Sequence, residues 1–102
     1  MLSVTLLTPA ELVRAVGARA KDRRLALGLG QAELSERAAV PLSSLRRFER
    51  TGRIGLEALA RLALALDAGE GVAALFPAPD LRRLEDVLAP PPRRRAPRRS
   101  RA

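Results

Sequence analysis

The fold is decided by QAELSERAAVPLSSLRRFER, residues 31–50. In its first part, 31–38, Leu34 and Ala38 lie four positions apart, which is the spacing of an inward-facing stripe on a helix of about two turns. The connection Ala-Val-Pro follows and ends in Pro41, and proline suits the start of a helix because it has no N–H to leave unpaired. We therefore predict two short helices joined by a tight turn.

The second of these helices, 41–50, has two unlike faces. Leu45 and Phe48 are three residues apart and share an apolar face. The opposite face carries a different set of side chains: Ser43, Arg46, Arg47 and Arg50. This pattern predicts a helix that packs on a core with one side and leaves basic groups exposed on the other.

A longer helix is predicted before this pair. Thr8, Pro9 and Glu11 have the spacing of a capping box, in which the Thr and Glu side chains bond to each other's backbone N–H. We expect this first helix to run to about Leu27, where Gly28 interrupts the helical pattern.

The sequence after the basic helix also predicts helices. TGRIG, residues 51–55, ends the third helix, and a short fifth helix is expected over 71–76, before Pro77. The fourth helix has an apolar stripe at helical spacing: Leu56, Leu59, Leu62, Ala63 and Leu66. The predicted fold class is therefore all-α, a compact bundle of four to five helices over residues 8–78.

Both ends of the chain differ from this domain. Residues 1–7 are predicted to form an N-terminal arm or a short strand, and 79–89 an amphipathic segment. Residues 90–102, rich in Arg and Pro, are expected to form a flexible, disordered basic tail. The net charge is +8, and most of that excess lies after residue 78, where eight basic residues face three acidic ones.

Composition excludes several classes of function. The chain has no Cys and no His, which removes disulfides, the usual zinc sites and nucleophile–base pairs built on these residues. No paired carboxylates are recognisable, so we expect no catalytic residue, no metal and no cofactor. With two aromatic residues, base stacking on aromatic platforms is not expected. No apolar run is long enough to span a membrane and no signal peptide is recognisable, so a cytoplasmic, nucleoid-associated protein without a membrane partner is expected.

Two short helices joined by a tight turn form the geometry of a helix-turn-helix unit. In such a unit the second helix lies in the major groove of DNA, where Arg can donate to guanine, Ser to bases or phosphates, and Leu can contact a thymine methyl group. Leu42, Ser43, Arg46 and Arg47 fall on one outward face. A merely solvated basic face is the alternative for the arginines, and the surrounding pattern favours DNA.

Residues 23–67, RRLALGLGQAELSERAAVPLSSLRRFERTGRIGLEALARLALALD, resemble the Cro and phage-repressor type of helix-turn-helix regulators, also called the xenobiotic-response-element (XRE) family. The matching positions are Gln31, Leu34, Leu45, Glu49 and Leu59. The resemblance implies a lambda-repressor-like fold, binding to double-stranded DNA and a homodimer that reads a palindrome.

The resemblance also implies roles for particular residues. Gln31 corresponds to a residue that contacts a phosphate or an edge base, and Glu49 to an acid that pairs with Arg24 of the first helix. The complete set of predicted DNA-binding residues is Gln31, Pro41, Leu42, Ser43, Ser44, Arg46, Arg47, Arg50 and Arg53. Ala39 and Gly30 depart from the family pattern, since the family usually has glycine in a left-handed turn at the first and a Ser or Thr cap at the second.

Two alternatives concern the C-terminal part. The segment from Phe48 onward, with LFPAPDLRRLEDVLAPPPRRR at 75–95, resembles HipB-type antitoxins, which implies a partner-binding module that neutralises a HipA-type toxin kinase and represses its own gene. The arginine tail alternatively binds phosphates without sequence preference, or serves as a solubilising tail.

Overall fold

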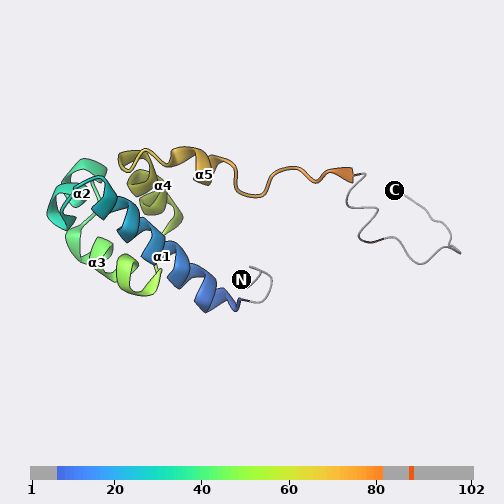
Figure 1. Cartoon of the computed structure of the whole chain (residues 1–102), viewed down its shortest axis with the longest axis horizontal. Helices are drawn as coiled ribbons and strands as arrows, with labels where there is room; N and C mark the ends of the chain where they lie inside the picture. The colour runs from blue at the N-terminus through green and yellow to red at the C-terminus, as the bar shows by residue number, and fades with distance from the viewer. Residues whose placement is uncertain (1–6, 82–87, 89–102) are drawn as a thin grey trace, which may run out of the picture.

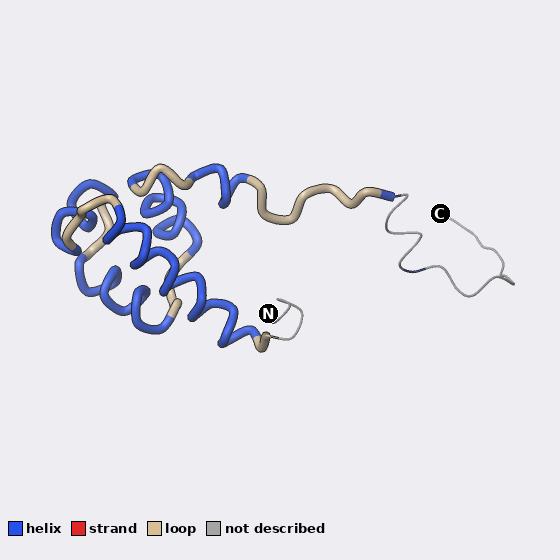
Figure 2. The backbone as a smooth tube through the Cα atoms, viewed as in Figure 1, coloured by secondary structure: helices blue, strands red, loops and turns tan. Residues whose placement is uncertain are grey.

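The computed structural model describes residues 7–81 and 88, and it is all-helical over this part of the chain, as predicted (Figures 1 and 2). In Figure 1 the first helix runs diagonally, and the others gather around its C-terminal half. The five helices are α1 (Pro9–Ala26), α2 (Gln31–Ala38), α3 (Leu42–Thr51), α4 (Leu56–Ala65) and α5 (Gly69–Ala73). The predicted four- to five-helix bundle is thus confirmed.

The predicted capping box at the start of α1 is confirmed. The Glu11 backbone N–H donates to Thr8 Oγ1 at 3.1 Å, and the Thr8 N–H donates to Glu11 Oε1 at 2.9 Å. Two N–H groups that have no partner within the helix are thereby satisfied. α1 ends at Ala26, and Gly28 follows with a φ of 74°, a left-handed conformation that glycine adopts readily.

A small apolar core joins α2, α3 and α4. Its most buried large side chains are Phe48, Leu34, Leu45 and Leu62, each at most 1% exposed, and side chains from the connections complete it. Burying each such side chain stabilises the fold by about 1.5–3 kcal/mol. The predicted inward positions of α2 and α3 are therefore confirmed, and their burial determines which face of α3 remains outside.

Two glycines allow the backbones of α1 and α3 to approach closely. Gly17 lies in the middle of α1, and a Cβ there would overlap the carbonyl oxygen of Phe48. Gly52, directly after α3, has a φ of 82°, and a Cβ there would overlap the carbonyl group of Val13. This crossing brings the C-terminal end of α3 against α1, a contact that the apolar pattern alone did not predict.

Several predicted boundaries are wrong by small amounts. α5 spans Gly69–Ala73 instead of 71–76, because the backbone turns early at Asp67, where φ is 56°. α3 covers Leu42–Thr51, with Pro41 as the residue that caps it instead of its first helical residue.

The predicted apolar stripe of α4 is wrong at one position. Leu56, expected on the inward face, is 69% exposed at the first residue of the helix. It lines a shallow, mainly apolar hollow together with Val72, Leu75 and Phe76, the last of which is 94% exposed.

The predictions for the two ends fall largely outside the described residues. Of the expected arm, 1–7, only Leu7 is described, and of the amphipathic segment, 79–89, only 79–81 and 88 are. The expected tail, 90–102, lies wholly outside the described part. Within residues 7–81 and 88, none of the helices has the length and apolar character needed to cross a bilayer.

The helix crossing generates a prediction about Gly17. Alanine is intrinsically the better helix residue by about 1 kcal/mol, so Gly17→Ala would stabilise an exposed helix. Here the added methyl group must push α1 and α3 apart, and we expect the free energy of unfolding to fall by about 1–3 kcal/mol. Chemical denaturation followed by circular dichroism measures this change.

Gly71→Ala is the matched control. Gly71 lies within α5, and a Cβ at this position would meet no atom within 4 Å. This variant should be neutral or slightly more stable than the wild type. Equal effects of the two substitutions would contradict the close crossing at Gly17.

Candidate nucleic-acid interface

The turn between α2 and α3 sets the angle between these helices. Ala39 has φ 56° and ψ 44°, the left-handed conformation in which the family pattern has glycine. The Ser35 hydroxyl donates to the Val40 carbonyl at 2.5 Å, and the Val40 N–H donates to the Ser35 carbonyl at 3.1 Å. Val40 is 2% exposed and belongs to the core. The turn is therefore held by hydrogen bonds as well as by burial.

This arrangement gives Ser35 a role that the sequence did not reveal. A serine in a short helix signals little beyond small size, and only the reversal of the chain at Ala39 brings its hydroxyl to the Val40 carbonyl. The bond gives a hydrogen-bond donor to the Val40 carbonyl, which lies in the connection between α2 and α3.

A buried ion pair joins α1 to α3. Arg24 Nε donates to Glu49 Oε2 at 2.7 Å, and Arg24 Nη2 donates to Glu49 Oε1 at 3.0 Å. The two side chains are 7% and 4% exposed. Arg24 Nη1 also donates to the Leu29 carbonyl at 2.9 Å. The pairing of Arg24 with Glu49, implied by the family resemblance, is present in the structure, and its bidentate geometry orients both side chains.

The environment of Glu49 favours its charged form. Burial by itself raises the pKa of Glu49, but hydrogen bonds from Arg24 and Gln31 and the charges of Arg24 and Lys21 outweigh burial, so its pKa lies below the ordinary value of 4.5. The hydrogen bond to Glu49 likewise raises the pKa of Arg24, against the opposing effect of burial. Both groups are charged at neutral pH, and the buried charges compensate each other.

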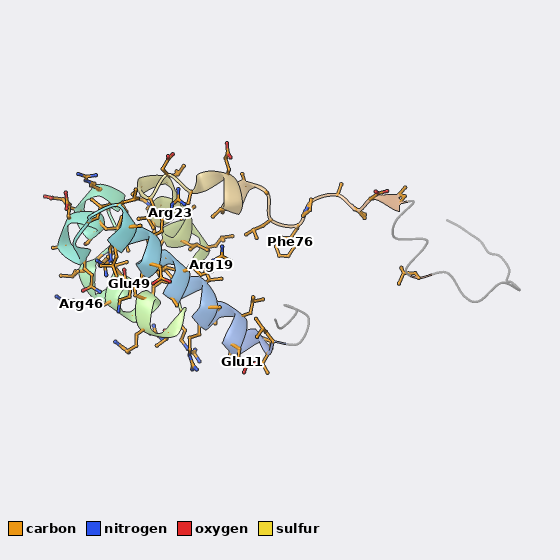
Figure 3. All side chains as sticks on the ribbon, in the orientation of Figure 1. Glu11, Arg19, Arg23, Arg46, Glu49 and Phe76 are labelled. Atoms are coloured by element: carbon orange, nitrogen blue, oxygen red, sulfur yellow. The ribbon has the colours of Figure 1, made fainter. Side chains whose placement is uncertain are left out.

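Gln31 extends this ion pair to the surface. Its Nε2 donates to Glu49 Oε1 at 2.9 Å, and its Oε1 accepts a long hydrogen bond of 3.4 Å from Arg46 Nε. Figure 3 shows Glu49 and Arg46 near one another at the end of the bundle where α2 and α3 meet. A continuous set of hydrogen bonds thus leads from buried Arg24 to an exposed arginine of α3.

This position of Gln31 adds to the role predicted for it. The prediction placed Gln31 against a phosphate or an edge base, which stays a prediction. The structure shows in addition that its amide is oriented by Glu49 and contacts Arg46. The sequence contained no signal for this second role, because Gln31 and Arg46 are brought together only by the α2–α3 turn.

The exposed face of α3 is rich in cations without acidic partners. Ser43, Arg46, Arg47 and Arg50 are exposed on α3, and Arg53 is exposed just after it. In the described part of the chain, ion pairs are formed by Arg24, Arg37 and Arg61, and none by the four arginines of this face. Their guanidinium groups are therefore available to an anion.

The remaining predicted contact residues lie at the N-terminal end of α3. Pro41 is exposed, whereas Leu42 and Ser44 are half-buried. Ser44 precedes the fully buried Leu45 and lies further from the exposed face than Ser43 does. The structure therefore places all the predicted α3 residues on one helix, with Ser44 at the margin of the exposed face.

Thr51 is a residue of this region that sequence reasoning missed. Its hydroxyl donates to the Arg47 carbonyl at 2.8 Å and accepts from the Arg53 N–H at 3.1 Å. It thus links the last turn of α3 to the backbone at Arg53, past the left-handed Gly52. A threonine directly before a glycine at the end of a helix is a signal that could have suggested this role.

Residues 7–81 and 88 contain no group of three or more acidic side chains placed to hold a metal ion. No protein-family model matches the sequence, and no curated protein matches it as a relative.

The buried ion pair generates a prediction about stability. Glu49→Gln leaves the charge of Arg24 buried without compensation, so we expect the free energy of unfolding at neutral pH to fall by about 3 kcal/mol. Glu57→Gln is the matched control, because Glu57 forms an exposed ion pair with Arg61, worth about 0.5 kcal/mol. Denaturant titration of the three proteins measures both changes.

The pH dependence of this effect has a definite sign. The folded-state pKa of Glu49 is depressed, so its contribution is complete above the unfolded value near 4.5 and is lost as the pH falls through the folded value. The stability difference between wild type and Glu49→Gln should therefore shrink as the pH is lowered from neutral into the acid range. A difference that stays constant down to pH values well below 4.5 would contradict this assignment.

Proposed function

We propose that the protein is a sequence-specific double-stranded DNA-binding transcriptional regulator that inserts α3 into the major groove. The observation that carries the proposal is the division of α3 into a face fully buried by Leu45 and Phe48 and a face of exposed arginines without acidic partners. The major groove, about 12 Å wide, admits a helix, and Arg forms its commonest specific contact, the pair of bonds to guanine.

The hydrogen bonds that link exposed Arg46 to the buried ion pair favour sequence-specific recognition of DNA. A surface that was only basic would bind DNA without sequence preference. Phosphate contacts carry no sequence information, whereas base contacts need side chains held in a defined geometry. Arg46 is tied through Gln31 to the buried pair of Arg24 and Glu49. Such a connection orients a side chain before the ligand arrives, so that less entropy is lost on binding.

We further propose that two copies act together as a repressor. Each copy would place α3 in one of two successive major grooves about 34 Å apart, so the preferred site is an inverted repeat. Such a pairing can cover apolar side chains that are exposed on α4 and after α5, among them Leu64 and Phe76. No described feature favours the antitoxin alternative, and residues 82–87 and 89–95 of the segment that resembles these antitoxins lie outside the described part of the chain.

The test of the proposal is selection from a random duplex library by the full-length protein. We expect enrichment of one inverted repeat whose half-sites are separated by about one helical turn. Failure to enrich any sequence, with binding to all duplexes alike, would contradict sequence-specific recognition. The full-length protein can also be incubated with cell extract and treated with nuclease. Retention of a protein in that experiment, without any enriched DNA, would support the partner-binding alternative.

A second test separates the roles of two arginines. Arg47→Ala removes a predicted base contact in the middle of the exposed face and should weaken binding by about 1–3 kcal/mol at one base position, relaxing the preference there. Arg53→Ala removes a predicted phosphate contact and should weaken binding to the selected site and to a scrambled duplex equally. Titrations with both duplexes measure these effects. Equal losses on both duplexes for Arg47→Ala would contradict its assignment as a base contact.

A further inference from the structure

The crossing of α1 and α3 brings together cations that are distant in the sequence. Gly52 lies against the peptide group that joins Val13 to Arg14, so close that a Cβ on Gly52 would come within 2.8 Å of the Arg14 backbone nitrogen. Arg53 follows Gly52 directly, and Arg50 precedes it in the last turn of α3. Arg14, Arg50 and Arg53 therefore extend from backbone positions around one crossing point, and we call them the crossing cluster.

The crossing cluster is exposed and has little local compensation. All three side chains are exposed, and within the described residues none of them forms an ion pair. Glu11 is the carboxylate next to Arg14 on α1, one turn away, and its Oε1 accepts a hydrogen bond from the Thr8 backbone N–H in the capping box. Hydrogen bonds from Thr8 lower the pKa of Glu11, and the charge of Arg14 adds to this effect. The cluster thus keeps a local excess of positive charge.

The position of the cluster along α3 determines what it can reach. A helix of ten residues is about 15 Å long, and the major groove is about 12 Å wide. With α3 in the groove as proposed, a side chain at its C-terminal end would reach the wall of the groove, where phosphates line the strand. Arg14, although it belongs to α1, originates at this same end of α3.

We propose that Arg14 is a phosphate-binding residue that acts with Arg50 and Arg53 on the DNA backbone at the edge of the groove occupied by α3. This inference rests on the proposed function and extends it: α1, besides supporting α3 from behind, contributes a contact of its own. The ligand is a backbone phosphate of the same duplex, so the contact strengthens binding to every sequence alike.

A second exposed arginine on α1 provides a matched control for this proposal. Arg14 is three residues before Gly17, on the side of the helix that borders α3. Arg19 is two residues after Gly17, which places it on the opposite side of α1, and it is exposed as well. Arg14→Gln and Arg19→Gln remove the same charge from the same helix, so differences between them report position alone.

The experiment measures the salt dependence of binding for full-length wild type, Arg14→Gln, Arg19→Gln and Arg14→Lys. The probes are the selected inverted repeat and a scrambled duplex of equal length. Loss of one phosphate contact lowers the slope of log affinity against log salt by about 0.9, and we expect this change for Arg14→Gln on both duplexes. Arg19→Gln should keep the wild-type slope, and Arg14→Lys should keep most of it because the charge remains.

The outcomes distinguish this inference from the proposed function. A wild type that selects an inverted repeat, with Arg14→Gln and Arg19→Gln showing the same slope, would overturn the role of Arg14 and leave the proposed function intact. A wild type that binds neither duplex would overturn both. Thermal melting confirms that each variant is folded, which the exposure of both arginines leads us to expect.

Discussion

The buried ion pair between Arg24 and Glu49 is the interaction on which the proposed DNA-binding surface depends. A pair of this kind contributes little net stability compared with apolar side chains of the same size, since both charges lose their hydration. What it provides is orientation, because two parallel hydrogen bonds fix the rotation of α3 relative to α1. Through Gln31 the same geometry reaches Arg46 on the exposed face. The arrangement of the surface is therefore set from within the core.

A second constraint acts about two turns away on α1. Gly17 and Arg24 are seven residues apart and lie on the same side of the helix, so α3 is held at two points roughly 10 Å apart. At one point the backbones touch, and at the other two side chains are bonded. Two contacts of this kind determine both the angle and the register of α3. The same crossing places Arg14 beside the end of α3, which joins the supporting helix to the exposed cations.

Much of the fold could be predicted where local chemistry decides it. The bounds of α2, the capping box at Thr8 and Glu11, and the burial of Leu45 and Phe48 all follow from spacing over a few residues. The start of α5 and the exposure of Leu56 could not be predicted in this way. Their positions depend on where the chain turns after α4 and on which neighbours are available to cover an apolar side chain.

The sequence by itself determined that the chain forms short amphipathic helices and that one of them carries arginines opposite its buried face. Resemblance to a known family added the pairing of Arg24 with Glu49. Only the tertiary structure decided that Gln31 connects this pair to Arg46 and that the backbone of Arg14 lies against Gly52 at the end of α3. The physical reason is that periodicity describes one helix at a time, whereas these contacts depend on the distance and angle between helices, which are set by glycines, a left-handed turn and the core.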